Sequence, residues 1–408
     1  MPQKMYAYVG NWSFQPKPLK GKGISIFQYD PENGDLNLLE TVRPDVAAGQ
    51  LYLDAERKML YAVDERGERR GEIGGGGYVM AFRIDSTTGK LTLVNEKESL
   101  SPEPSYLCLD KSKKYLVACH CSDPFHVTKI TQRPDGSYGN EVLFDDTALV
   151  MFRINEDGSL GDVCDVVVTE GTGGKSPRSQ VNIDPVSGHI QLVEVISRQH
   201  SVVASPSGEM LAVCDKGMDR IYTYRIDREN GKLVPLDTWI AEEIACFPRY
   251  CAFHPVLPVY YANNENYAGI NSFHYEEETG KLNLLKKLFL LPEDPGKVEG
   301  KPVGAQDITV HPNGKHLYCT LNGLHLIVVC DLDHNGLPIV KQVVKSNGKM
   351  PRGIRLSPDS RFLLSGNMLS GDITTFAVNE DGSLTFTEKI FEAVSPSAIQ
   401  FFAGDLET

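Results

Sequence analysis

The 408-residue sequence is poor in features that place a chain in a membrane or outside the cell. It has no run of about 18 apolar residues, so no segment is predicted to span a bilayer as a helix. The first residues, MPQKMYAYVGNW, lack the apolar core of a signal peptide. The nine cysteines are odd in number and form no CxxC pair, which predicts reduced thiols in a cytoplasmic protein.

Three further absences limit the function. Basic residues (41) are fewer than acidic residues (54), and the net charge of −13 argues against nucleic acid as a partner. No GxSxG motif is present, so covalent serine catalysis has little support. Trp-Asp dipeptides are missing, which argues against a WD40 array.

What the sequence does contain is a repeat. Seven segments share an alternating apolar and polar run, a polar turn, and then a glycine followed closely by leucine. They are ISIFQYDPENGDL (Gly34), VMAFRIDSTTGKL (Gly89), LVMFRINEDGSL (Gly158), IYTYRIDRENGKL (Gly231), INSFHYEEETGKL (Gly280), LIVVCDLDHNGL (Gly336) and DITTFAVNEDGSL (Gly382). Alternation predicts strands, and Asn-Gly or Asp-Gly predicts tight hairpins, so each segment is expected to form two strands, C and D.

A second hairpin, of strands A and B, lies between successive segments. Examples are LYLDAERKMLYAVDE, SVVASPSGEMLAVCD and IRLSPDSRFLLSGN. His254 and His311, in His-Pro pairs of two such hairpins, are predicted to be turn residues. The termini complete the count, because PSAIQFF (396–402) is an A strand without a B and MYAYVGNW (5–12) is a B strand without an A.

This arithmetic predicts an all-β chain folded as a seven-bladed β-propeller with four strands per blade. The N-terminal and C-terminal strands would pair to close the ring and remove its exposed edges. We predict a single domain over residues 1–408, with insertions at 122–148 and 165–198.

Chain direction predicts where polar residues converge. The A strand lines the central channel, and the starts of A strands lie on the same face of the disc as the ends of B strands. Starts of A are Tyr106, His200, Arg249, Gln306–Asp307, Arg352 and Ser397. Ends of B are Asn11, Asp64–Glu65, His120, Asp215, Asn264–Glu265, Asn322 and Asn367. Burying a charged side chain costs free energy unless it is paired or hydrated, so this set of residues predicts a polar pocket.

The residue types favour chemistry on an ester or an acid. Arg249 and Arg352 each follow a proline, which stiffens the strand start, and the planar fork of arginine suits a carboxylate or phosphate. Arg249 could stabilise a developing oxyanion, and either Glu265 or His200 could serve as a general base. Arg352 with His120 could hold a carboxylate or phosphate.

Asn264, Asp307 and Glu65 complete the predicted substrate-binding set. A Ca²⁺ site built from Glu65, Asp215, Glu265 and Asp307 is disfavoured by the adjacent arginines, so no metal and no cofactor are expected. For Asp215, Asp219 and Arg220 in DKGMDR, hydrogen bonds between blades are the preferred interpretation.

The chain resembles the seven-bladed propeller lactonases of the 6-phosphogluconolactonase type, which are related to the muconate-cyclising enzymes. The matching strings are YAYVGNW, LYAVDE, QHSVVASPSGEMLAVCDKGMDRIYTYRID, FPRYCAFHP, YYANNEN, AQDITVHPNGKHLYC and MPRGIRLSPDSRFLLSGN. The resemblance implies that the family's active-site residues fall on His200, Arg249, Glu265 and Arg352. The chain departs from the family pattern at Tyr106, where the family commonly has His, at His120–Cys121, and in the longer approach to His200.

We therefore expect a metal-independent lactonase that hydrolyses 6-phosphogluconolactone or a related aldonolactone to the open-chain sugar acid. Two alternatives stay open. One is a carboxymuconate-type cycloisomerase or lyase on the same face, and the other is a non-catalytic propeller that binds a protein or ligand. The expected partner is a small sugar lactone, with no nucleic acid and no membrane. The sequence predicts no oligomeric state.

Overall fold

The structure is a computed structural model. It describes residues 3–12, 22–66, 68–69, 72–73, 75–121, 126–144, 146–169, 179–183, 190–194, 196–242, 246–292, 297–298 and 301–405. Within these residues all 36 regular elements are strands.

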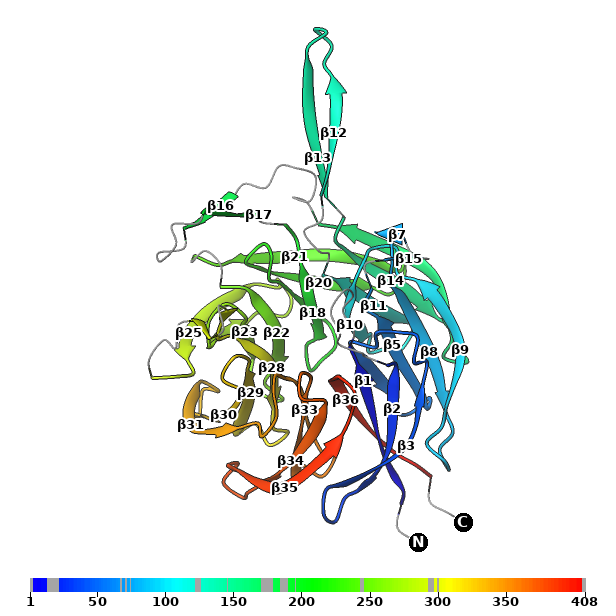
Figure 1. The fold of residues 1–408 in the computed structure, drawn as a ribbon, viewed down its shortest axis with the longest axis vertical. Helices are drawn as coiled ribbons and strands as arrows, with labels where there is room; N and C mark the ends of the chain where they lie inside the picture. The colour runs from blue at the N-terminus through cyan, green and yellow to red at the C-terminus, as the bar shows by residue number, and fades with distance from the viewer. Residues whose placement is uncertain are drawn as a thin grey trace.

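Twenty-eight of the strands form seven antiparallel four-stranded sheets, the blades, each in the order A-B-C-D (Figure 1). The glycine repeat and the hairpins between its copies are therefore confirmed as C–D and A–B pairs. Blade I consists of β36 (Pro396–Ala403), β1 (Met5–Asn11), β2 (Ile24–Asp30) and β3 (Asp35–Val42), and blade II of β4 (Leu51–Asp54), β5 (Met59–Asp64), β8 (Tyr78–Ile84) and β9 (Leu91–Glu98). Blade III consists of β10 (Pro104–Leu109), β11 (Tyr115–His120), β14 (Ala148–Ile154) and β15 (Leu160–Val168), blade IV of β18 (Gln199–Ala204), β19 (Leu211–Asp215), β20 (Arg220–Asp227) and β21 (Lys232–Ile240), and blade V of β22 (Pro248–Phe253), β23 (Val259–Asn264), β24 (Gly269–Tyr275) and β25 (Leu282–Phe289). Blade VI consists of β28 (Ala305–Val310), β29 (His316–Leu321), β30 (Leu326–Leu332) and β31 (Pro338–Lys345), and blade VII of β32 (Pro351–Leu356), β33 (Phe362–Asn367), β34 (Asp372–Val378) and β35 (Leu384–Glu392).

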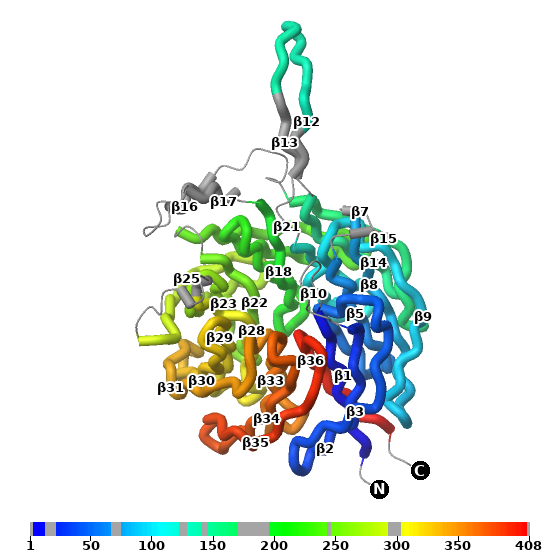
Figure 2. Tube along the Cα trace, viewed as in Figure 1, coloured from blue at the N-terminus to red at the C-terminus, as the bar shows by residue number. Residues whose placement is uncertain are grey.

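The ring is closed. Each A strand contacts the A strand of the next blade, from β4 through β10, β18, β22, β28 and β32 to β36, which contacts β4 again. The last closure is made by strands from opposite ends of the chain, since β1 pairs antiparallel with β36, for example Tyr8 with Gln400. In Figure 2 these two strands, dark blue and red, lie side by side. The structure is thus the predicted seven-bladed β-propeller.

Four extra hairpins are inserted into the blade connections. They are β6 (Glu68–Arg69) with β7 (Glu72–Ile73), β12 (His126–Gln132) with β13 (Tyr138–Phe144), β16 (Ser179–Ile183) with β17 (Ile190–Glu194), and β26 (Lys297–Val298) with β27 (Lys301–Pro302). All four lie in B–C or D–A connections, which belong to the face where A strands begin and B strands end. We call this the site face. The β12–β13 hairpin extends well beyond the ring (Figure 1).

The two predicted insertions correspond to two of these hairpins. The segment 122–148 contains β12–β13, and the segment 165–198 contains the end of β15 and β16–β17. Residues 122–125, 145, 170–178, 184–189 and 195 lie outside the described residues.

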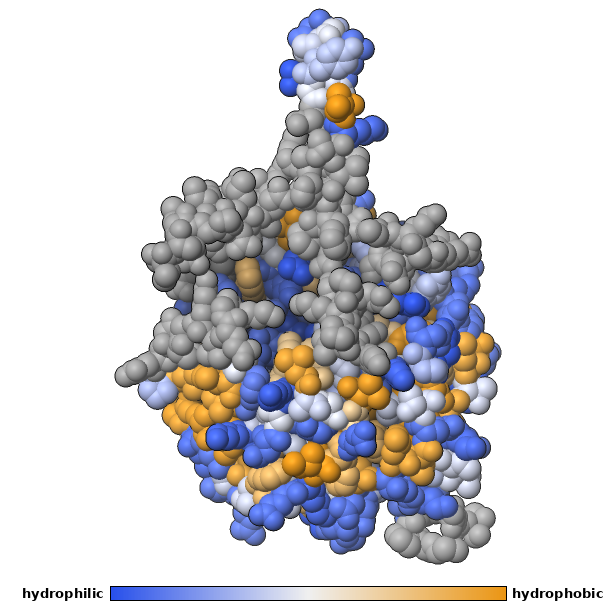
Figure 3. Space-filling view, viewed as in Figure 1, coloured by the Kyte–Doolittle hydropathy of each residue, from blue (hydrophilic) through white to orange (hydrophobic). Residues whose placement is uncertain are grey.

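The core lies between blades. Seven clusters of buried apolar side chains occur in the described chain, and each joins two neighbouring blades. The cluster between blades VII and I, for example, packs Leu364 and Ile373 against Ala7 and Phe27. The outer strands carry exposed apolar residues such as Leu285 and Ile390. On the face seen in Figure 3, such groups are interspersed with hydrophilic ones.

The glycine that marks each repeat is also the joint between blades. A hydroxyl group of one blade donates a hydrogen bond to a carbonyl in the C–D turn of the next blade, usually that of the repeat glycine. The seven bonds are Tyr8–Gly89 (2.9 Å), Tyr61–Gly158 (2.8 Å), Tyr115–Arg228 (3.0 Å), Thr223–Gly280 (2.9 Å), Tyr261–Gly336 (2.6 Å), Tyr318–Gly382 (3.0 Å) and Thr375–Gly34 (3.4 Å). Gly382 has φ of 79°, a conformation that glycine adopts without strain.

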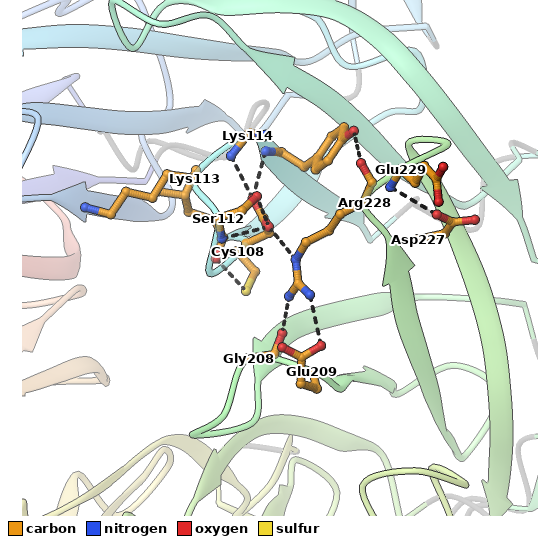
Figure 4. Close-up of polar contacts among 12 residues, drawn as sticks. Cys108, Ser112, Lys113, Lys114, Gly208, Glu209, Asp227, Arg228 and Glu229 are labelled. Atoms are coloured by element: carbon orange, nitrogen blue, oxygen red, sulfur yellow. Dashed lines mark hydrogen bonds and ion pairs between the residues drawn. The ribbon is translucent and has the colours of Figure 1, made fainter.

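The joint between blades III and IV adds an arginine (Figure 4). Arg228 donates to the carboxylate of Asp110 (3.1 Å) in blade III and, within blade IV, to Glu209 (2.9 Å) and the Gly208 carbonyl (2.7 Å). Asp110 also accepts the backbone N–H groups of its own A–B turn, including that of Tyr115. One carboxylate therefore fixes both a turn and a neighbouring blade.

The joint hydrogen bonds make a testable contribution to stability. In Tyr318→Phe the buried Gly382 carbonyl loses its donor, and we expect a loss of about 1 to 3 kcal/mol in the free energy of unfolding. Urea denaturation of the variant and wild type measures this difference. Tyr138→Phe is the matched control, because Tyr138 is 70% exposed. Equal destabilisation by the two changes would show that the joint bonds do not contribute.

Candidate active site

A repeated irregularity positions residues at the channel. In six blades the A–B pairing shifts register directly after the first pair at the site face, which leaves one extra residue on the A strand. Such β-bulges bend a strand and re-aim its side chains. The residues between the paired positions, which we call the bulge ring, are Ser105, His200, Arg249–Tyr250, Gln306–Asp307, Arg352 and Ser397.

Polar side chains of the B strands stabilise two of these bulges. Asn263 accepts a hydrogen bond from the Tyr250 N–H (2.9 Å), and the Thr320 hydroxyl oxygen accepts one from the Asp307 N–H (3.0 Å). The bulges would otherwise leave these N–H groups without ladder partners. The sequence around the bulges therefore supports the displaced conformation.

A second ring is set by one backbone hydrogen bond that recurs in all seven blades. The residue directly after each B strand donates its N–H to a carbonyl in the segment that leads into the A strand of the same blade, one residue before that strand in six blades and four residues before it in blade II. The donors, which we call the post-strand ring, are Trp12, Glu65, Cys121, Lys216, Glu265, Asn322 and Met368, and the acceptors are Ser395, Ala47, Glu103, Arg198, Phe247, Gly304 and Met350. The post-strand ring and the bulge ring lie at the same rim.

Arg249 and Glu265 form one centre of the site. The Nε atom of Arg249 lies 3.3 Å from Oε2 of Glu265, and Nζ of Lys216 lies 2.8 Å from the same oxygen. Burial alone would raise the pKa of Glu265, but Lys216, Arg249 and Arg198 outweigh it and lower the pKa to about 2. Glu265 is therefore an ionised anchor at neutral pH.

The guanidinium of Arg249 makes further contacts besides the one with Glu265. It is 1% exposed, it donates to the Gln306 carbonyl, and its carbon lies 4.4 Å from the centroid of the Tyr250 ring. An arginine has five N–H donors in a fixed plane, so this fixation leaves further donors in a defined orientation. Such a group is suited to stabilise negative charge at one position.

Arg352 and Glu65 form a second centre. Nη2 of Arg352 lies 3.3 Å from Oε1 of Glu65, and its guanidinium carbon lies 4.2 Å from the Trp12 ring centroid. Burial raises the pKa of Glu65, and Arg352, Arg249 and Lys216 oppose the rise. A Cβ at Gly49 would lie 1.8 Å from Oε2 of Glu65, so the lack of a side chain at Gly49 makes room for the carboxylate.

His200 is a further buried member of the rim. Its ring lies 5.3 Å from that of Tyr250, which lies 5.4 Å from that of Tyr106. Burial, together with Arg249, Lys216 and Arg352, lowers the pKa of His200 well below its usual value. The imidazole is neutral at physiological pH as a result. Arg249, Lys216 and Arg352 also act on Glu65, so the two centres share one electrostatic environment.

Several buried polar atoms at this rim make no hydrogen bond with the described residues. Among the described residues, Nδ1 of His200, Oδ1 of Asn264 and Nε of Arg352 have no hydrogen-bond partner. Most buried polar atoms in proteins are paired, so a cluster of such atoms at one rim indicates a binding site.

Two predicted substrate-binding residues are engaged in the fold. Asp307 uses one oxygen for the N–H of Ile308 (2.8 Å) and the other for the N–H of Ile354 in blade VII (2.7 Å). Burial raises its pKa to about 6. His120 is bound through Nδ1 to the Ala148 carbonyl (2.7 Å), and burial lowers its pKa to about 4. These contacts hold both side chains in the fold, while Nε2 of His120 has no hydrogen-bond partner in the described residues, and the substrate-binding roles of both stay predictions.

Three other residues singled out in the sequence have different hydrogen-bond partners. Asn264 donates to the Tyr267 hydroxyl (3.0 Å) and sits beside Glu265. Asp219 accepts the N–H of Phe247 (2.9 Å), which links blades IV and V as predicted. Asp215 accepts hydrogen bonds from its own turn and from Ser197 and Arg198, which lead into β18 of the same blade, so the prediction of a bond between blades is wrong for Asp215.

The turn histidines are confirmed as turn residues. Nδ1 of His254 accepts the N–H groups of Val256 and Leu257, and Nδ1 of His311 accepts that of Asn313. Neither therefore belongs to the rim.

Lys216, Tyr250 and Trp12 were missed by sequence reasoning. Lys216 follows the B strand directly, as Glu65 and Glu265 do, so its position in the repeat was a signal that could have identified it. In the described part of the chain no group of three or more His, Cys, Asp or Glu side chains could hold a metal ion. In the same residues no helix is long and apolar enough to cross a membrane.

Comparison with known proteins identifies the family and several relatives of the chain. The model of a family described as "Lactonase, 7-bladed beta-propeller" matches residues 7–401. A 6-phosphogluconolactonase of Formosa agariphila is 24% identical over 97% of the chain and 99% of its own length. That of Bacillus subtilis is 22% identical over 98% of each. The solved periplasmic gluconolactonase of Pseudomonas aeruginosa has a similar fold, with a TM-score of 0.75, 22% identity, and 98% and 100% coverage of the two chains.

The buried pair of Arg352 and Glu65 makes a prediction about stability. Arg352→Met leaves Glu65 as an unpaired buried carboxylate, and we expect a loss of about 3 to 5 kcal/mol at neutral pH. The double change with Glu65→Met should cost less than the single change. The single variant's deficit should shrink as the pH falls, because protonation neutralises Glu65. Chemical denaturation at two pH values measures both effects, and a double variant less stable than Arg352→Met would contradict the pairing.

Proposed function

The chain belongs to the seven-bladed β-propeller lactonase family, and from that premise we propose that it hydrolyses 6-phosphogluconolactone or a related aldonolactone to the open-chain sugar acid. The observation that carries this proposal is the pair of buried arginines, Arg249 and Arg352, at the same rim as His200, whose pKa both help to lower. The relatives named 6-phosphogluconolactonase and gluconolactonase support the same substrate class.

The charges of the rim favour an anionic sugar. Arg249, Arg352 and Lys216 act together on Glu65 and His200, although the chain as a whole carries −13. An arginine fork binds carboxylates and phosphates in a bidentate manner, and the reaction product itself is a carboxylate. Arg352, whose Nε has no hydrogen-bond partner in the described residues, is the residue we assign to the acidic end of the substrate.

The base is best assigned to His200. Oε2 of Glu265 already contacts Arg249 and Lys216, and its pKa of about 2 makes it a weak base. Neutral His200 has an unpartnered Nδ1 that can accept a proton. Burial, and then Arg249, Lys216 and Arg352, depress its pKa in the free protein, and an anionic substrate beside the arginines would weaken their share of that effect.

The reaction then follows from these groups. Water gives a proton to Nδ1 of His200 and attacks the carbonyl carbon of the lactone. Arg249 donates hydrogen bonds to the oxyanion of the tetrahedral intermediate. The bond from that carbon to the ring oxygen breaks, and the imidazolium returns the proton to the departing alcohol. The products are one hydroxyl group and one carboxylic acid, which ionises to a carboxylate at neutral pH and releases the proton that the assay measures.

The thiols favour a reducing compartment. All nine cysteines are free, and all but Cys164 are buried. We therefore propose a cytoplasmic location for this lactonase.

Two substitutions test the assignment of roles. Arg249→Ala should lower kcat by about 100- to 1000-fold, the effect of removing an oxyanion donor. His200→Gln should lower kcat by about 100-fold or more, the usual contribution of a general base. Opening of 6-phosphogluconolactone and of gluconolactone, followed by proton release, measures both. Arg225→Ala is the control, because Arg225 is an exposed residue of β20. Wild-type-like turnover in both rim variants would remove this mechanism.

Chelation tests the metal-free proposal separately. Because the described rim joins carboxylates to arginine and lysine, we expect turnover with EDTA to equal turnover without it. Rates after dialysis against EDTA, with and without Ca²⁺ or Mg²⁺ added back, provide the measurement. A metal-restored activity would mean that a cation site, and not Arg249, stabilises the oxyanion.

A further inference from the structure

We propose that Lys216 is a positioning residue of the lactonase site, whose ammonium group fixes the Glu265 carboxylate so that Glu265 can hold the Arg249 guanidinium in place. The inference rests on the proposed role of Arg249. It concerns Lys216, which was not among the residues predicted for the site and which takes no part in the reaction steps above.

The geometry places Lys216 in a shared contact. Its Nζ atom and Nε of Arg249 approach the same oxygen of Glu265, at 2.8 and 3.3 Å. Neither cation is at the surface, since the side chain of Lys216 is 12% exposed and that of Arg249 is 2% exposed. A shielded ion pair of this kind is worth more than an exposed one, because solvent screens it less.

The backbone holds all three residues in register. Lys216 donates its N–H to the Arg198 carbonyl (3.1 Å), and Glu265 donates its N–H to the Phe247 carbonyl (2.9 Å). These are the same repeated bond of the post-strand ring in neighbouring blades. Lys216 thus reaches Glu265 from blade IV, while Arg249 reaches it within blade V.

One carboxylate oxygen between two cations has a consequence for protonation. The charged groups that act on Glu265 are Lys216 after β19, Arg249 of β22, and Arg198 before β18. Burial favours the protonated acid, and these cations overcome it. Without Lys216, the balance moves toward protonation, and a neutral Glu265 would no longer hold Arg249 as an ion pair. Lys216 therefore keeps the oxyanion donor in position at acidic pH.

A direct action on the base is the competing explanation. Lys216 is also among the cations that lower the pKa of His200. Removing it would ease protonation of both Glu265 and His200, so an experiment must separate the two residues.

The test is the pH dependence of kcat/KM for lactone opening, between about pH 4 and pH 9. In Lys216→Met we expect the acidic limb to move upward by about 1 to 3 pH units, the range by which a neighbouring charge shifts a carboxyl pKa. Lys216→Arg, which keeps the charge, should restore the wild-type profile. Lys315→Met is the matched control, since Lys315 is an exposed lysine of an A–B turn on the opposite face. Superimposable profiles for Lys216→Met and wild type would overturn the proposal.

A measurement without turnover separates this proposal from the lactonase function. Wild-type Glu265 stabilises the fold above its unfolded pKa and loses that effect as the pH falls toward about 2. The Tm deficit of Lys216→Met should therefore be largest at neutral pH and shrink below about pH 4.5. In a Glu265→Gln background Lys216→Met should show no such pH dependence. If the dependence persists there, Lys216 acts through another titratable group, His200 or Glu65, and the proposal fails, whether or not any lactone is opened.

Discussion

One backbone hydrogen bond determines where the functional side chains of this protein stand. In each blade the residue after the B strand donates its N–H to a carbonyl in the segment that leads into the A strand. The bond joins the end of the B strand to the start of the A strand. It therefore brings the residue after the B strand close to the first residues of the A strand, at the same rim. Glu65, Lys216 and Glu265 occupy this position in three blades, and the bulges beside it displace His200, Arg249 and Arg352. The position of the site therefore follows from hydrogen bonds and bulges that recur from blade to blade.

Much of this could be read from the sequence, for a physical reason. Alternating strands and glycine turns are local signals, and the glycine that permits a tight turn also supplies the carbonyl that joins blades, as Gly382 does for Tyr318. Strand direction follows from counting, so the rim assignment of Arg249 and Arg352 required no side-chain detail. The seven-bladed ring and its closure by β1 and β36 were predicted for the same reason.

What the sequence did not predict depends on pairings between distant residues. The bulges arise from register between strands, which no single strand reveals. Asp307 was expected to face a substrate, but both of its oxygens hold backbone groups, one of them in the next blade. Lys216 lies in the motif DKGMDR, which was interpreted as structural. That interpretation is right for Asp219, which bonds the Phe247 N–H, but it overlooks the contact of Lys216 with Glu265. Tyr250, which stacks on Arg249, is hidden in an ordinary strand sequence.

The division of the molecule into two faces explains how such a site is tolerated. Buried charges cost free energy unless each has a partner, and at this rim Glu265 pairs with Arg249 of its own blade and with Lys216 of blade IV, while Glu65 of blade II pairs with Arg352 of blade VII. Tight turns close the opposite face, whereas the four extra hairpins of the described chain all interrupt connections of the site face. Sequence at the rim is therefore free to serve a ligand, because stability is supplied by the seven apolar clusters between blades and by the hydroxyl bonds to the glycine turns.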